Sequence, residues 1–277
     1  DQSPSSDPFD VIVVDDHSED DTGDRVREAA EAMPALRLVT APRHGGLARS
    51  RNLGVHSCDA QFLLFTDDDC VPAPDWVVRM REALRRAPIV AGAVESPRNG
   101  YLTLCHNVAE FHAFLPIHAA GRAAFIAGAN MGIRREVIEK IGPFNESMAC
   151  AEDMEFALRA REASCEIRFA PEAVVVHAHQ RRRFGEILRY AAEHAATTIQ
   201  LRQSHRKLLR TPLPLRSPLL LLLSAPLIAL AVCAGVGLRA ARTIRLWKTL
   251  PTVYVTKLAW CVGAARGLRR SRRRPSC

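Results

Sequence analysis

The residues of this chain best suited to chemistry are three consecutive aspartates, Asp67, Asp68 and Asp69. They follow an apolar run, residues 61–65, which is too short for a helix and suits a strand buried on both faces of a parallel sheet. The aspartates would then lie at the carboxyl edge of the sheet, where open α/β sheets bind ligands. Two carboxylates roughly 5 Å apart repel by about 3 kcal/mol, and a divalent cation such as Mg²⁺ or Mn²⁺ would remove that cost. The alternative is a solvated turn ahead of the next helix.

A second acidic pair, Asp15 and Asp16, follows a β-branched run over residues 9–14. An acidic side chain at a strand end can accept a hydrogen bond from a ribose hydroxyl or a uracil imide, and helix capping is the simpler alternative. The glycine-rich stretch 45–54, GGLARSRNLG, opens a helix and contains Arg51. Such a helix start can receive a diphosphate or a base, although glycines there are a weak signal alone.

Further candidates lie in the second half of the chain. Glu152 and Asp153 lie in the first turn of a helix expected over residues 151–163, where acidic residues are ordinary complements of the helix dipole and only in some proteins catalytic. His177 follows a strand expected over residues 173–176, and a lone histidine at a strand end is more often structural than a ligand.

The elements that must position these residues alternate along the chain. Gly128 and Gly132 flank Asn130, which indicates backbone passing close to a ligand or a tight turn. Strands are expected at residues 9–14, 36–40, 61–65, 88–94, 167–169 and 173–176, and helices at 21–33, 45–54, 75–86 and 151–163. The pattern predicts an α/β domain over residues 1–205, with a mostly parallel sheet and flanking helices.

Charge divides the chain into two parts. Glu193 is the last acidic residue, and 16 of the 38 Lys and Arg residues follow it, so that the first 193 residues carry a net charge of −8 and the rest +16. The basic tail, residues 269–277, could bind nucleic acid, but it lies beside an apolar segment. We therefore expect an anionic membrane surface as its partner and no nucleic acid.

The cysteines and the start of the chain indicate the compartment. The eight cysteines are scattered without a CxxC pair, so neither a zinc site nor a disulfide scaffold is expected, and a reducing compartment follows. Residues 1–8 are polar and rich in Pro and Ser, which predicts an irregular lead-in rather than a signal peptide.

Residues 206–277 are expected to form a basic, membrane-associated region. Residues 217–238 are 22 residues without a charge, and as a helix they would measure roughly 33 Å, enough to cross a hydrocarbon core. Pro226 would kink this helix without preventing a span, and a buried core helix is the alternative. Residues 246–262 carry two lysines among aromatic residues, which is typical of an interfacial segment.

Four stretches together resemble the family 2 glycosyltransferases of GT-A fold. They are VVDDHSEDDT, GGLARSRNLG with FTDDDC, GANMGIRREVIEKIGPFNE, and AEDMEFALRAR with VVVHAH, and the likeness covers about residues 9–200. In that family an N-terminal strand with a PTYN-like sequence normally precedes the VVDD strand. Here the chain starts only nine residues before it, so we expect one edge of the nucleotide pocket to be missing.

The resemblance implies roles for the candidate residues. Asp15 and Asp16 would bind the nucleoside, whereas Asp67 and Asp69 would hold Mn²⁺ or Mg²⁺ on the diphosphate. Asp153 would be the catalytic base. We further expect Glu152 in the catalytic site, Asp68 and Arg51 in nucleotide contact, and His177 as a metal or diphosphate contact.

The predicted activity is transfer of a sugar, with inversion, from a nucleotide-sugar donor to an acceptor hydroxyl on a glycan or a lipid-linked sugar. Because sugar nucleotides are cytosolic, the catalytic domain of this membrane-associated chain is expected to face the cytoplasm. Two alternatives stay open. A haloacid-dehalogenase-like phosphatase would use Asp67 as its nucleophile, since residues 65–71 fit that DxDx(T/V) pattern. A membrane-tethered glycosyltransferase remnant would bind a sugar nucleotide without turnover.

Overall fold

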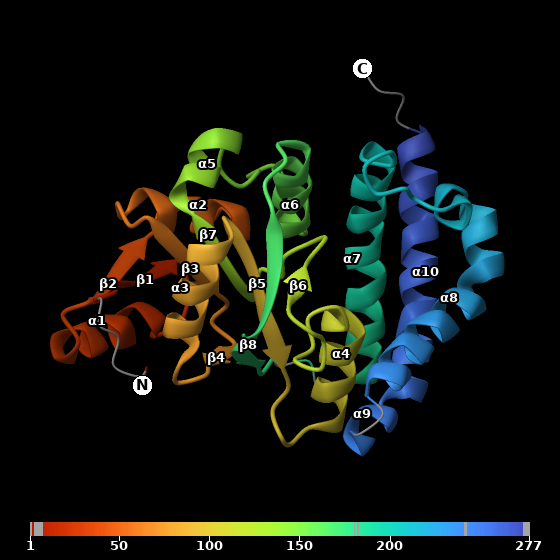
Figure 1. Cartoon of the computed structure of the whole chain (residues 1–277), viewed down its shortest axis with the longest axis horizontal. Coiled ribbons are helices and arrows are strands. Elements are labelled where there is room, and N and C mark those ends of the chain that lie inside the picture. Colours follow the sequence, from red (N-terminus) through yellow and green to blue (C-terminus); the bar gives the residue numbers. More distant parts are fainter. Residues whose placement is uncertain (1, 3–7, 180, 182, 241–242, 274–277) are drawn as a thin grey trace.

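The computed structural model describes residues 2, 8–179, 181, 183–240 and 243–273. Most of the expected irregular lead-in, and residues 274–277 of the basic tail, lie outside this part of the chain. Figure 1 shows an α/β body followed by a layer of long helices that contains α7, α8 and α10. The strands are β1 (Val11–Asp15), β2 (Leu36–Thr40), β3 (Phe62–Thr66), β4 (Cys70–Pro72), β5 (Ile89–Glu95), β6 (Gly121–Arg122), β7 (Asn130–Arg134) and β8 (Ile167–His177). The helices are α1 (Thr22–Ala32), α2 (Leu47–His56), α3 (Trp76–Arg86), α4 (Tyr101–Phe111), α5 (Arg135–Ile141), α6 (Glu152–Glu162), α7 (Phe184–Ser204), η1 (Leu213–Arg216), α8 (Pro218–Arg239), α9 (Ile244–Trp247) and α10 (Leu250–Arg273).

The predicted α/β class is confirmed, but the sheet is mixed. β1 and β2 pair in parallel in a two-stranded sheet, and the larger sheet has the order β3-β7-β5-β8-β4, with β6 also paired to β8. β5 and β8 are parallel, whereas β7 runs antiparallel to both β3 and β5. β7 is inserted between two strands of equal direction, which an apolar pentapeptide pattern does not reveal. The strand before the aspartates is therefore not buried on both faces of a parallel sheet, and Leu63 is its buried residue.

The core is built on β5, whose residues Ile89 to Val94 are all buried. α3 covers one face of the larger sheet with Trp76, Val77, Met80 and Leu84, which recur at helical spacing. Asn130 is fully buried here: its amide donates to the carbonyls of Ala93 and Ala173, and its Oδ1 accepts from Trp76 Nε1. The Asn130 side chain therefore cross-links β5, β8 and α3 inside the core.

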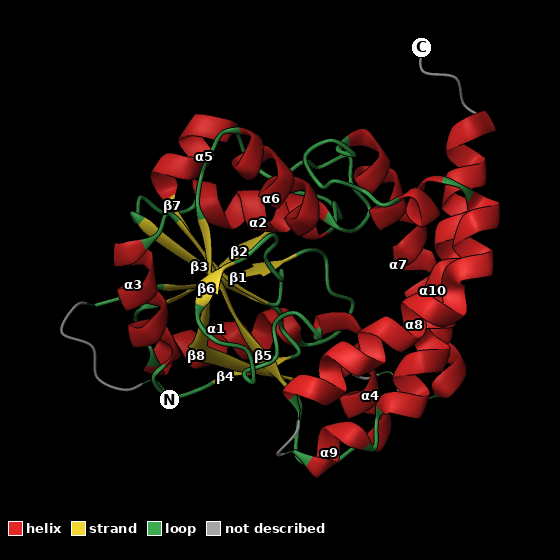
Figure 2. Ribbon diagram, turned by 45° about the vertical axis from the view of Figure 1, so that its right-hand side comes forward, coloured by secondary structure: helices red, strands yellow, loops and turns green. Residues whose placement is uncertain are grey.

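The last helices pack against the α/β body. α10 lies between α7 and α8 (Figures 1 and 2). A Cβ at Gly263 would come within 1.9 Å of the Ala192 carbonyl oxygen, so glycine is needed where α10 meets α7. Cys261, Ala264 and Leu268 of α10 are buried in this contact. Residues 246–262, the segment expected to be interfacial, are therefore divided between α9 and α10, and α10 has one buried side.

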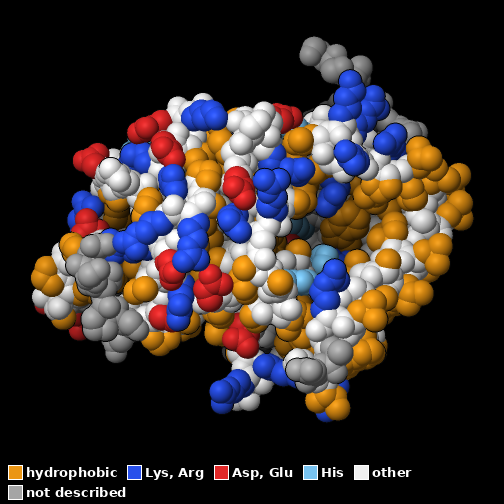
Figure 3. Space-filling view, in the orientation of Figure 1, with side chains coloured by type: hydrophobic (Ala, Val, Ile, Leu, Met, Phe, Trp, Pro, Cys, Tyr) orange, Lys and Arg blue, Asp and Glu red, His pale blue; other side chains and the backbone are white. Residues whose placement is uncertain are grey.

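α8 is the apolar helix expected from the sequence. Within the described residues it is the one helix long and apolar enough to cross a membrane, with a mean hydropathy of 2.6 and 28% of that stretch buried. A core helix would be mostly buried, whereas most of this stretch of α8 is exposed. In Figure 3 hydrophobic side chains cover the side of the molecule where α8 lies.

Candidate active site

The aspartate turn after β3 brings Asp69 next to His177. Cys70 begins β4 directly after the turn, and β4 pairs with β8 so that Cys70 lies opposite His177. Asp69 Oδ1 is 3.3 Å from His177 Nε2, and the thiol of Cys70 lies in the same cluster. Burial raises the pKa of the Cys70 thiol to about 12, and a thiol is a softer ligand than the oxygen ligands that Mg²⁺ and Mn²⁺ prefer. Asp69 and His177 therefore lie close enough together to share a cation.

A buried asparagine fixes the orientation of His177. Asn107 is fully buried on α4, and its Nδ2 donates to the backbone oxygen of His177 at 2.8 Å. Its Oδ1 therefore faces His177 Nδ1, also at 2.8 Å, and must accept a hydrogen bond from that nitrogen. The remaining nitrogen, Nε2, points its lone pair or a second proton at Asp69. Two acceptors 3.3 Å apart need a positive centre between them, either that proton or a metal ion.

Arg51 connects two of the predicted motifs. Its guanidinium is 9% exposed and donates to Glu152 Oε1 and, at 3.1 Å, to Asp67 Oδ1. Burial lowers the pKa of Arg51, but the charges of Glu152, Asp67 and Asp153 outweigh burial and raise it. A Cβ at Gly128 would lie 2.5 Å from this guanidinium. The backbone at Gly128 therefore makes the close approach expected from the sequence, but its partner is the Arg51 side chain and not a ligand. Asp67 is thus turned toward Arg51.

Asp153 is held by backbone donors. Its Oδ2 accepts from the amide of Gly128 at 2.8 Å, and its Oδ1 accepts from the amide of Met154 at 2.6 Å. Burial raises the pKa of Asp153, and the neighbouring Glu152 raises it further, while Arg51 opposes both. A carboxylate with a raised pKa is better able to take up a proton near neutral pH.

Asp15 and Asp16 have their described partners in the neighbouring loops. Asp16 accepts from the amides of Gly45 and Gly46 at 2.9 and 2.8 Å, and so ties the end of β1 to the start of α2. Asp15 accepts from the amide of Ser18, and hydrogen bonds from Ser18 lower its pKa. The structure therefore gives Asp16 a structural task and leaves Asp15 open to solvent.

A groove of about 550 Å³ runs past the aspartate turn. It is lined by Asp68 and Asp69 and by residues after β8 and on α7, namely His179, Arg181, Glu186, Arg189, Tyr190 and Glu193. The guanidinium of Arg181 lies 4.0 Å from the ring centroid of Tyr190. His179 is 4% exposed, and among the described side chains its Nε2 has no hydrogen-bond partner.

A second ion pair, which is half-buried, lies between α4 and α7. His194 Nδ1 is 3.0 Å from Glu110 Oε1. Burial raises the pKa of Glu110, but the hydrogen bond and charge of His194 outweigh burial and lower it to about 2. Burial lowers the pKa of His194, but the hydrogen bond that His194 donates to Glu110 and the charges of Glu110, Asp153 and Glu152 outweigh burial and raise it. The charge of Asp153, the candidate base, therefore also acts on His194.

Sequence reasoning missed several of these residues. Asn107, Glu110, Tyr190 and His194 lie on helices, without a strand end or a glycine to mark them. The polar residues of α4, His106, Asn107 and Glu110, interrupt an otherwise apolar helix and were the available signal.

An α/β sheet with carboxylates, a buried arginine and a histidine converging at a strand end is typical of enzymes that bind a metal–diphosphate group. Comparison with known proteins identifies the family. The Glycosyl transferase family 2 profile matches residues 1–142, and the chain belongs to this family. The resemblance found in the sequence is confirmed, and family membership replaces the phosphatase alternative.

Individual relatives support the same conclusion. Glycosyltransferase AglE of Haloferax volcanii is 26% identical over 183 residues, which are 65% of this chain and 60% of that protein. The probable glycosyltransferase YdaM of Bacillus subtilis is 32% identical over 181 residues, 61% of this chain and 43% of that one. The chain therefore spans less than two thirds of the length of these relatives.

A solved structure shows the same fold. The mannosyltransferase PcManGT from Pyrobaculum calidifontis, solved in complex with GDP-Man and Mn²⁺, superposes with a TM-score of 0.61 at 22% identity. The match covers 95% of this chain and 78% of that one. The GT-A fold expected from the resemblance is thus confirmed.

Proposed function

We propose that the chain transfers a sugar from a nucleotide-sugar donor to an acceptor hydroxyl with inversion at the anomeric carbon. The observation that carries this proposal is the pairing of Asp69 with a histidine whose Nδ1 is engaged by Asn107, beside a groove and a backbone-held Asp153. Solved relatives of the fold contain Mn²⁺ with GDP-Man or with UDP, which fits this donor set of oxygen and imidazole ligands.

Asp69, His177 and Asp67 would hold Mn²⁺ or Mg²⁺. When bound, the cation supplies Lewis-acid stabilisation of the charge on the departing nucleoside diphosphate. Arg51 keeps Asp67 in place through an ion pair that also includes Glu152, so Glu152 acts by positioning. Asp15 and Asp68, whose carboxylates are accessible, are assigned to the nucleotide. Arg51 and Asp16 support its pocket indirectly, Arg51 through its ion pairs and Asp16 through the amides of Gly45 and Gly46.

Asp153 is assigned as the general base. The acceptor hydroxyl loses its proton to Asp153 as its oxygen forms a bond with the anomeric carbon, and the nucleoside diphosphate leaves with the electron pair of the broken C–O bond. The two backbone donors hold the carboxylate in one orientation, and its raised pKa suits proton uptake.

We also propose that the chain is membrane-associated through α8, with the catalytic body in the cytoplasm. The mostly exposed apolar length of α8 supports membrane association. The supply of sugar nucleotides on the cytoplasmic side supports the orientation.

The test is the stereochemistry of donor hydrolysis, in which water replaces the acceptor. With Mn²⁺ and an α-linked nucleotide sugar, ¹H NMR should show the β-anomer as the first free sugar, and Asp153→Asn should cut its formation by roughly 100-fold or more while donor binding persists. First appearance of the α-anomer would contradict inversion. Donor binding without any turnover in the parent chain would support the non-catalytic remnant instead.

A further inference from the structure

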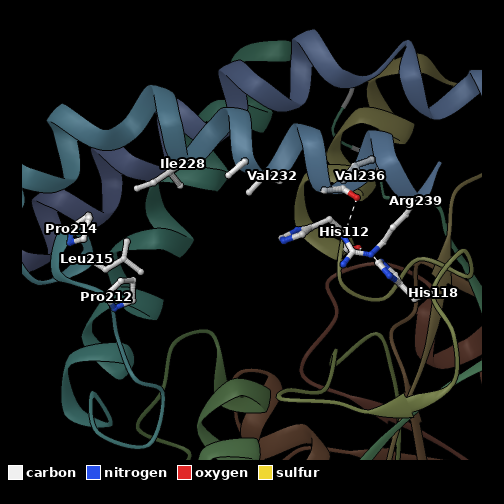
Figure 4. Close-up of a pocket in the computed structure, with 11 residues that line it drawn as sticks. His112, His118, Pro212, Pro214, Leu215, Ile228, Val232, Val236 and Arg239 are labelled. Atoms are coloured by element: carbon white, nitrogen blue, oxygen red, sulfur yellow. Dashed lines mark hydrogen bonds between the residues drawn. The ribbon is translucent and has the colours of Figure 1, made fainter. Parts of the chain in front are cut away.

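A cavity of about 460 Å³ lies under α8, outside the site described above. Its volume falls in the range of roughly 300–1,000 Å³ that small-molecule sites occupy. Its lining comes from the end of α4 and the loop that follows, from the segment around η1, and from one side of α8. Figure 4 shows Pro212, Pro214 and Leu215 at one end of the cavity and His112, His118 and Arg239 at the other. The cavity therefore has an apolar end and a nitrogen-rich end, and none of its lining residues is acidic.

α8 has three distinct sides. The side toward the cavity consists of residues spaced by three or four positions: Ile228, Ala231, Val232, Gly235, Val236 and Arg239. A second side is buried toward α10 and includes Leu221, Ala225, Ala229 and Cys233. The third side exposes large leucines, among them Leu219, Leu223 and Leu227 with 65–70% of their surface exposed. A helix with such an exposed side is suited to contact lipid, which places the cavity beside a source of hydrocarbon chains.

The nitrogen-rich end adjoins the candidate active site. Phe111, the last residue of α4, packs its ring 5.1 Å from the ring of His177. His112 follows directly, and its backbone oxygen is 2.7 Å from His118 Nε2. Burial and the charge of Lys257 lower the pKa of His112 to about 4, so this imidazole is neutral and Arg239 carries the charge at the cavity lining.

We propose that this cavity binds the hydrocarbon chain of a phosphate-bearing lipid, and that this lipid carries the acceptor. The chain lies against Leu215 and Ile228, and the phosphate meets the guanidinium of Arg239. The head group then continues past Phe111 toward His177. The assignment of the lipid as acceptor rests on the proposed glycosyltransfer.

Two features select a phosphate lipid over other occupants. A neutral apolar ligand would leave Arg239 without a counter-charge: this exposed guanidinium donates to the backbone oxygen of Gly235 at 3.0 Å and has further donors for an anion. A water-soluble sugar would leave the apolar end of the cavity against water. An amphiphile with one anionic end satisfies both ends at once.

The binding experiment uses the full chain in a nonionic detergent, with farnesyl phosphate below its micelle concentration as the probe and calorimetry as the readout. Farnesol and inorganic phosphate are the two partial ligands. Farnesyl phosphate should bind about tenfold or more tightly than farnesol, because Arg239 forms a charge-assisted contact, and inorganic phosphate should not bind measurably. Equal binding of farnesol and farnesyl phosphate would overturn the assignment of the phosphate end.

Two matched substitutions on α8 test the position of the site. Ala231→Trp fills the cavity, whereas Ala234→Trp makes the same change at an exposed residue that does not line it. Ala231→Trp should weaken farnesyl phosphate binding by about tenfold or more, and Ala234→Trp should leave it within about twofold. Equal affinities of the two variants would overturn the proposal.

Two further readouts keep the outcomes separate. If Ala231→Trp does not fold, a benzophenone-tipped farnesyl phosphate replaces it: labelling of residues 212–215 supports the site, and labelling confined to the exposed leucines of α8 overturns it. Mn²⁺-dependent binding of UDP and GDP is measured on every variant. Cavity binding without any nucleotide binding would refute the glycosyltransfer and the acceptor role but leave the lipid site standing, and the reverse result would refute the lipid site alone.

Discussion

Asn107 offers a sharp test of how the site holds a cation. Asn107→Leu removes two buried hydrogen bonds, one to the ring of His177 and one to its backbone oxygen. Each unsatisfied buried group costs about 1–3 kcal/mol, so the free energy of unfolding should fall by roughly 3 kcal/mol. Loss of the group that orients a metal-binding histidine typically weakens metal affinity by about 10–100-fold. Mn²⁺ affinity, measured by electron paramagnetic resonance of the free ion, should fall by that factor.

A matched control separates orientation from stability. Asn52 is also buried and bonds to both the backbone nitrogen and oxygen of Phe144, away from His177. Asn52→Leu should cost similar stability but leave Mn²⁺ affinity within about threefold. Asn107→Asp should retain most of the affinity, because a carboxylate still accepts from His177 Nδ1. Equal Mn²⁺ affinities for Asn107→Leu and the parent chain would refute the role given to Asn107.

Two further predictions concern the helical layer. Because the pKa of His194 is raised by Glu110, their pair stabilises the fold fully below about pH 6.5, the ordinary histidine value, and this contribution is lost as pH rises through the raised value. The melting temperature of His194→Gln should therefore lie below that of the parent at pH 6 and approach it at pH 9, and a constant gap would contradict this sign. The full chain should stay with membranes in a high-salt wash, which removes only electrostatic binding, whereas the double variant Leu223→Glu, Leu227→Glu should be released; release of the parent by salt alone would refute insertion of α8.

The sequence allowed the prediction of those site residues that follow strands. Asp69 and His177 each close a strand or its turn, and the carboxyl ends of β3 and β8 meet at one edge of the fold. The antiparallel insertion of β7 was not predictable, because Gly128 and Gly132 indicated only a close approach of backbone. The structure shows that the Arg51 side chain packs against Gly128 and the Leu84 side chain against Gly132.

The helical contributions needed tertiary structure. Asn107 contacts His177 across 70 residues of chain, and His194 pairs with Glu110 from a different helix, so no local sequence pattern links either residue to Asp69. Likewise, the aromatic and lysine residues of the segment after α8 resemble an interfacial pattern, and only the packing of Gly263 against Ala192 shows that α10 is fixed to α7.

The most direct test of the central claim is Mn²⁺-dependent nucleotide binding by calorimetry, with UDP and GDP tested in parallel. The parent chain should bind at least one of them only when Mn²⁺ is present. Asp69→Ala should lose this binding and keep the parent circular dichroism spectrum, while Asp59→Ala, an exposed aspartate in the loop before β3, should bind as the parent does. Unchanged Mn²⁺-dependent affinity in Asp69→Ala would contradict a metal–nucleotide site at this edge of the sheet.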